Sequence, residues 1–156
     1  MSLEKAKEAV EFELEEIESL FDLYKEELFD LNKIPNLVEL TAFASVLHSF
    51  YNGIENIFLT IAKNIDKNVP TDSNWHKDLL LQMTKENECR KPVLSKEMKD
   101  ELKKYLTFRH FFRHSYSFTL EWKEVEKLVK PIHLVWERFK SEILSFLSSA
   151  VEKDNK

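Results

Sequence analysis

Apolar residues recur every three or four positions along four long stretches of this chain, and that spacing predicts amphipathic helices. The stretches cover about residues 3–31, 37–65, 96–118 and 120–151. Polar segments that each contain a proline separate the first three stretches, as expected of loops. A shorter helix is predicted between the second and third stretches, over residues 75–85.

Local sequence signals add detail to the second, third and last of the long predicted helices. The second stretch is apolar around most of its girth, so we expect it at the centre of a bundle or at a subunit interface. Gly53 lies in its middle and costs about 1 kcal/mol relative to Ala, which suggests close approach of another backbone. Pro131 should kink the last helix about one turn upstream. Ser95 and Thr119 are the expected N-caps of the third and last long helices.

Composition supports the same fold class. The chain has one glycine and four prolines in 156 residues, so it has few of the turn residues that a β-rich fold requires. Hydrophobic residues make up 43% of the sequence, which is typical of a globular protein. We therefore predict an all-α, up-down helical bundle of four main helices plus one short helix, forming a single domain over residues 1–156.

Charge and cysteine content narrow the location and the partners. The net charge of −5 argues against broad, non-specific binding to nucleic acid. The single cysteine, Cys89, excludes an internal disulfide and indicates a reducing compartment. Neither a signal peptide nor an apolar run long enough to span a bilayer is visible, so we expect a cytoplasmic protein without a membrane partner. One window is clearly basic, because residues 102–120 carry Lys and Arg but no acidic side chain.

That basic window contains the groups needed to cleave RNA without a metal. When a 2′-hydroxyl attacks the adjacent phosphate, the reaction needs proton transfer and a cation near the developing charge. Histidine suits proton transfer near neutral pH, and arginine suits the phosphate because its planar fork stays charged. Arg109 and His114 supply this pair. The required 2′-hydroxyl makes RNA, and not DNA, the expected substrate.

The spacing of the pair adds a geometric condition. Arg109 and Tyr116 are seven residues apart, so a regular helix places them on nearly the same face. Arg109 and His114 are five apart and would point roughly 140° from one another. Either the helix distorts locally or a second chain completes the site. We favour a two-fold homodimer, which would gather two arginines and two histidines across a cleft.

Two other interpretations of the same residues remain open. The cluster of Arg109, His110, Arg113 and His114 also fits a solvated polar face or a set of ion pairs within the bundle. His110 and His114 have the i, i+4 spacing of metal ligands, but no carboxylate or cysteine stands beside them. We therefore expect neither a metal nor another cofactor.

The pattern Arg109-x4-His114-x-Tyr116 resembles the R-x4-H-x-Y motif of HepT-like toxins in the HEPN superfamily. The residue after the arginine is usually polar in that superfamily, and His110 fits this class. Residues 51–58, which surround a single Glu, resemble the second-helix pattern of the family, and residues 120–122 resemble the start of its last helix. The resemblance spans about residues 41–147.

The resemblance implies a helical-bundle endoribonuclease that acts as a homodimer in a toxin–antitoxin pair. Arg109 would contact the scissile phosphate, His114 would transfer protons, and His110 would position RNA. The implied antitoxin is a small nucleotidyltransferase that adds AMP to Tyr116.

Two supporting residues and a rival function complete the expectations. Glu55 is a candidate to orient Arg109 from the neighbouring helix, or else an exposed neighbour within its own helix. Arg113 either widens the basic cleft or pairs with a carboxylate. We assign no role to His48, His76 and His133. The rival function is a catalytically silent helical module that dimerises or binds a nucleotidyltransferase, which the acidic net charge and the aromatic pair Phe111-Phe112 keep open.

Overall fold

The computed structural model describes residues 2–114, 116 and 119–154, and this part of the chain is helical without a β-strand. Seven α-helices and one π-helical turn lie within it. In chain order they are α1 (Leu3–Leu23), α2 (Lys25–Phe29), α3 (Leu37–Ile61), the π-helical turn η1 (Ala62–Asp66), α4 (Trp75–Gln82), α5 (Lys96–Arg113), α6 (Trp122–Val129) and α7 (Ile132–Asp154). The prediction of an all-α fold is confirmed.

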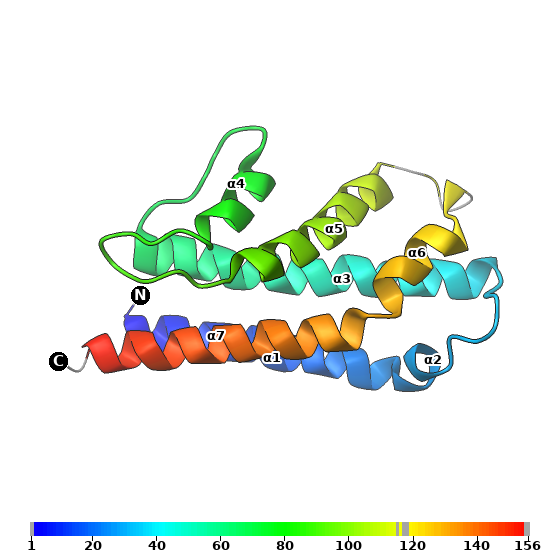
Figure 1. Ribbon diagram of the computed structural model, residues 1–156, viewed down its shortest axis with the longest axis horizontal. Helices are drawn as coiled ribbons and strands as arrows, with labels where there is room; N and C mark the ends of the chain where they lie inside the picture. The colour runs from blue at the N-terminus through cyan, green and yellow to red at the C-terminus, as the bar shows by residue number, and fades with distance from the viewer. Residues whose placement is uncertain (1, 115, 117–118, 155–156) are drawn as a thin grey trace.

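The four long helices alternate in direction (Figure 1). α3 runs through the middle, with α1 and α7 side by side below it in the view and α5 crossing above. Aromatic contacts join the layers at the centre, where the ring of Phe50 on α3 packs against those of Phe21, Tyr105 and Trp136. The central position predicted for the second helix is thus confirmed, since more than half of the residues of α3 are buried.

Gly53 marks the closest packing between α1 and α3. A Cβ atom at this position would lie 2.7 Å from Cγ1 and 2.9 Å from Cδ1 of Ile17. Both distances are shorter than van der Waals contact, so a glycine is required by packing. The expected close approach is present, but it is made by a side chain of α1 and not by a second backbone.

Two of the long predicted helices are each divided in the structure. The first breaks at Tyr24, whose backbone leaves the helical region, and α2 follows. The apolar spacing runs through the break because Leu28 and Leu31 still pack against the core. The last is divided at Lys130 and Pro131, where the proline lacks the N–H that a continuous helix would use. The expected kink is therefore a break between α6 and α7.

Three helix ends in the structure also differ from the predicted ones. α3 ends at Ile61, and η1 continues to Asp66 before Lys67 adopts a left-handed conformation with φ 56°. α5 ends at Arg113 rather than near Phe118, which lies outside the described residues. The N-cap of α6 is Glu121 and not Thr119. Ser95 caps α5 as predicted, since its hydroxyl accepts a hydrogen bond from the Met98 amide.

The buried apolar residues of the core come from several helices along the chain. No helix in the described part of the chain is both long enough and apolar enough to cross a membrane.

Candidate functional site

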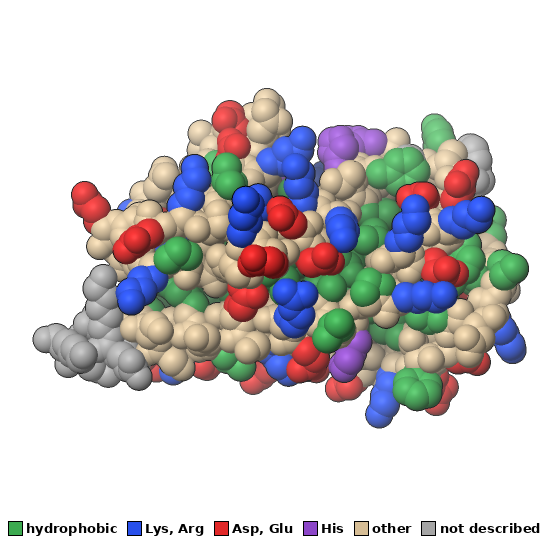
Figure 2. All heavy atoms as spheres, viewed as in Figure 1, with side chains coloured by type: hydrophobic (Ala, Val, Ile, Leu, Met, Phe, Trp, Pro, Cys, Tyr) green, Lys and Arg blue, Asp and Glu red, His purple; other side chains and the backbone are tan. Residues whose placement is uncertain are grey.

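The motif lies at the carboxyl end of α5. His114 is the C-cap of this helix, with φ −111° and ψ 9°, and its amide donates to the Phe111 carbonyl over 3.1 Å. The backbone thus remains α-helical through Arg113 and departs from the helix at His114. His110, Arg113 and His114 are exposed, and the rings of the two histidines lie 4.6 Å apart. Figure 2 shows histidine side chains grouped above the last turns of α5.

Arg109 points in a different direction, toward α3. Its Nε donates a 2.6 Å hydrogen bond to Oδ1 of Asn52, and one terminal nitrogen lies 3.7 Å from Oε1 of Glu55. Only 12% of its side chain is exposed. The structure therefore does not bring Arg109 and His114 of one chain together into a tight pair: one is held against α3 and the other faces solvent.

Glu55 is the buried acidic member of this cluster, with 3% of its surface exposed. Its Oε1 faces Arg109, and its Oε2 lies 2.8 Å from Nδ1 of His76 on α4. A buried carboxylate without partners would be strongly unfavourable, and these two contacts compensate the burial. Of the two interpretations of Glu55 from the sequence, the contact with the motif helix is the one the structure contains.

Sequence reasoning missed Asn52, His48 and His76. For the first two a signal exists, because His48, Asn52 and Glu55 follow a spacing of four and then three along a helix that is otherwise largely apolar. That spacing places them on one face, and α5 packs against that face. His76 carries no such signal, since it approaches Glu55 from a separate helix 21 residues along the chain.

Comparison with known families identifies the fold around this cluster. A family model described as HepT-like protein matches residues 42–150, well over half of the chain. This chain belongs to the HepT-like family. The match covers α3 to α7 almost completely and includes both the motif and the Asn52–Glu55 pair. Comparisons with curated proteins and with solved structures give no match.

His48 on α3 also lies beside the HepT-like motif. The ring of His48 packs 5.4 Å from that of Phe112, centroid to centroid. Burial lowers the pKa of His48, and the positive charges of Arg109 and Arg113 lower it further. Its Nδ1 and the hydroxyl of Tyr51 are buried with no hydrogen-bond partner among the described residues. Burial, and next the charge of Glu55, raise the pKa of Tyr51, so its hydroxyl stays protonated.

Tyr116, the last residue of the HepT-like motif, is on the surface, where it is 75% exposed. Its carbonyl accepts hydrogen bonds from both the amide and the hydroxyl of Thr119.

An open groove beside α5 is not part of this cluster. The groove has a volume of about 880 Å³ and lies between α5 and α6. Its walls include Phe108, Phe111 and Leu128, and Glu121 and Glu124 also line it. Neither Arg109 nor His114 lines it, so the groove lies outside the Arg109–Glu55 cluster, although Phe111 of the motif segment is one of its walls.

Proposed function

We propose that this HepT-like chain is a metal-independent endoribonuclease, the toxin of a toxin–antitoxin pair, and that it works as a homodimer. The observation that carries the proposal is the end of α5, where exposed His110, Arg113 and His114 follow an arginine anchored by Asn52 and Glu55. This arrangement joins fixed positive charge to solvent-accessible imidazoles, which is the chemistry that RNA cleavage requires.

In the proposed reaction the 2′-oxygen of RNA forms a bond to the adjacent phosphorus, and the bond from phosphorus to the 5′-oxygen breaks. One imidazole accepts the proton of the 2′-hydroxyl, and a second donates a proton to the leaving 5′-oxygen. Arg109 stabilises the negative charge that grows on the phosphate oxygens, while Arg113 and His110 bind the flanking RNA. The products are a 2′,3′-cyclic phosphate and a free 5′-hydroxyl.

The homodimer follows from the need for two imidazoles in defined positions. His114 is exposed at the helix end, while Arg109 points toward α3, so one chain offers these two groups in divergent directions. A two-fold axis beside the end of α5 would bring together two copies of His114, one as base and one as acid. RNA would then cross the boundary between the two chains.

The proposed antitoxin is a nucleotidyltransferase that modifies Tyr116. The Tyr116 oxygen would attack the α-phosphate of ATP, giving an AMP–tyrosine ester and releasing pyrophosphate. The 75% exposure of Tyr116 supports this step, because the phenol must enter another enzyme's active site. The added AMP would place negative charge and bulk next to the cluster and repel RNA.

The decisive experiment is RNA cleavage in EDTA by the purified protein. We expect the wild type to cleave and His114→Ala to lose cleavage by about a hundredfold to ten-thousandfold, the range typical of a group that transfers a proton in the transition state. His133→Ala is the matched control, since His133 is 79% exposed on α7, away from the motif. Equal cleavage by wild type and His114→Ala would exclude the proposed mechanism.

One observation favours the second candidate, a catalytically silent module that dimerises or binds a nucleotidyltransferase. The guanidinium of Arg109 is already occupied by Asn52 and Glu55, as expected of a residue that only joins α5 to α3. The same assay separates the two candidates. A silent module leaves RNA intact in EDTA, yet still forms a dimer or a complex with a nucleotidyltransferase.

A further inference from the structure

His76 makes the closest contact to the buried carboxylate that faces Arg109. Its Nδ1 lies 2.8 Å from Oε2 of Glu55, and a carboxylate can only accept, so the proton of this contact is on Nδ1. The imidazole is also held by Trp75, whose ring centroid lies 3.6 Å away. The stacking and the hydrogen bond together fix the orientation of the His76 ring.

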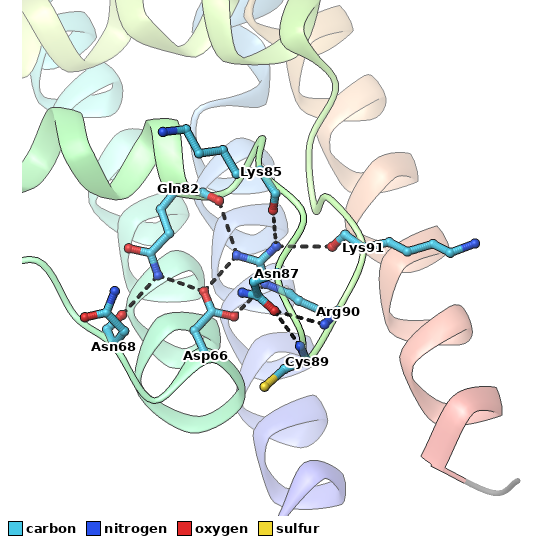
Figure 3. Close-up of polar contacts among 8 residues, drawn as sticks. All are labelled: Asp66, Asn68, Gln82, Lys85, Asn87, Cys89, Arg90 and Lys91. Carbon is cyan, nitrogen blue, oxygen red and sulfur yellow. Dashed lines mark hydrogen bonds and ion pairs between the residues drawn. The ribbon is translucent and has the colours of Figure 1, made fainter.

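The helix that carries His76 is anchored at its other end by a buried ion pair, which Figure 3 shows in close-up. Arg90 binds both carboxylate oxygens of Asp66 at 2.6 and 2.7 Å, and each of the two side chains is only 2% exposed. Gln82, the last residue of α4, donates to Asp66 at 2.7 Å, and its carbonyl accepts from Arg90 at 3.2 Å. The carboxyl end of α4 is therefore tied to η1, and its amino end reaches Glu55.

Glu55 in turn divides its two oxygens between two partners. Because Oε2 is occupied by His76, Oε1 is the oxygen that faces Arg109. Asn52 fixes the same guanidinium through Nε. Of the five N–H donors of an arginine, only Nε–H is hydrogen-bonded, because the 3.7 Å contact with Glu55 is an ion pair without a hydrogen bond.

We propose that His76 is a positioning residue: it holds Glu55 so that Glu55 and Asn52 orient the Arg109 guanidinium toward the scissile phosphate. The effect on catalysis rests on the proposed ribonuclease function, but the effect on Arg109 does not. His76 itself touches Glu55 and Trp75 and has no contact with RNA in this scheme.

The test uses three His76 variants of the full chain. In His76→Asn the side-chain amide nitrogen is bonded to Cγ, as Nδ1 is, so it can donate to Glu55. His76→Gln places its amide nearer the Nε2 position, and His76→Leu has no donor. The first readout is the Nε–H signal of Arg109 in protein with ¹⁵N-labelled arginine, assigned from its loss in Arg109→Lys. The second is RNA cleavage in EDTA.

We expect the Arg109 Nε–H signal to be sharp in wild type and His76→Asn, and shifted and broadened in His76→Leu and His76→Gln. Cleavage should fall by at least about tenfold in kcat for Leu and Gln, with KM less affected, because loss of orientation acts in the transition state. The His76→Asn variant should retain most of the wild-type kcat for RNA cleavage. His133→Asn is the matched control and should change neither readout.

Each outcome decides between the two proposals. An Arg109 signal that is unchanged in His76→Leu overturns the positioning role, whatever the activity, and so does failure of His76→Asn to restore it. If the signal responds as expected but the wild type does not cleave RNA, the positioning contact is supported and the ribonuclease function is overturned. Far-ultraviolet circular dichroism identifies any variant that fails to fold, and His76→Gln, closest to histidine in volume, then replaces His76→Leu.

Discussion

His48 lies one turn before Asn52 on α3, and its surroundings disfavour protonation. Burial, followed by the charges of Arg109 and Arg113, lowers its pKa below the ordinary value of 6.5 in the folded protein. In the unfolded chain the same imidazole regains its ordinary pKa. Between the two values the unfolded state binds more protons, so the free energy of unfolding decreases as the pH falls below about 6.5.

We predict that this pH dependence is weaker in His48→Gln, which keeps a polar side chain but cannot be protonated. Urea unfolding at pH 7 and pH 5 measures the difference in free energy of unfolding for wild type and variant. The loss on acidification should be smaller in His48→Gln. His133→Gln, at an exposed position, should match the wild type. Identical losses in His48→Gln and wild type would contradict the assignment of this titration to His48.

The packing of α1 on α3 gives a prediction about the steric role of Gly53. An alanine in its place would gain about 1 kcal/mol of helix propensity, but its Cβ would lie 2.7 Å from Cγ1 of Ile17. Because Cγ1 is close to the backbone of a buried residue, it cannot move away easily. Overpacking should therefore outweigh propensity, and Gly53→Ala should lower the free energy of unfolding by about 1–2 kcal/mol.

A double-mutant cycle separates sterics from propensity. In an Ile17→Ala background the clash is absent, so the same Gly53→Ala change should become neutral or stabilising. Thermal or urea unfolding of the four proteins gives the coupling energy. If Gly53→Ala has the same effect in both backgrounds, the contact with Ile17 is not the reason for glycine at this position.

The helices show what apolar spacing can and cannot predict. The pattern located every long helix and the central place of α3, because those features depend on which faces are buried. It missed the break at Tyr24, because a one-residue departure leaves the spacing of Leu28 and Leu31 intact. It also extended α5 past Arg113, since aromatic and apolar residues continue beyond the point where the helix ends.

The same distinction applies to the candidate site. The contact of Glu55 with Arg109 could be anticipated, because Glu55 is an acidic residue on a helix that is otherwise largely apolar. His76 was not, because its approach to Glu55 depends on where α4 lies. That place is set by contacts between α4, η1 and the loop containing Arg90, none of which leaves a periodic signal in the sequence.

The Arg90–Asp66 pair ties three separate parts of the chain into one folded unit, so its effect belongs to global stability. Both side chains are 2% exposed, and Arg90 also donates to the carbonyls of Lys85, Lys91 and Gln82. Removing one partner leaves the other as an uncompensated buried charge. We predict that Arg90→Leu and Asp66→Leu each lower the free energy of unfolding by about 3–5 kcal/mol.

The double variant Arg90→Leu/Asp66→Leu separates two causes of destabilisation: an unpaired buried charge, and the loss of the hydrogen bonds that anchor α4. With both charges removed, the remaining losses are the hydrogen bonds from Arg90 to the carbonyls of Lys85, Lys91 and Gln82 and the hydrogen bond from Gln82 to Asp66. The double variant should therefore be less destabilised than the sum of the single variants, with a coupling energy of about 1–3 kcal/mol in urea unfolding. Additive losses would mean that the pair acts through packing alone. In the double variant Gln82 loses its contacts with Asp66 and Arg90 and keeps only its 3.0 Å hydrogen bond to the Asn68 carbonyl, so α4 is held less firmly. The Arg109 Nε–H signal should therefore broaden, although His76, Glu55 and Arg109 are all unchanged.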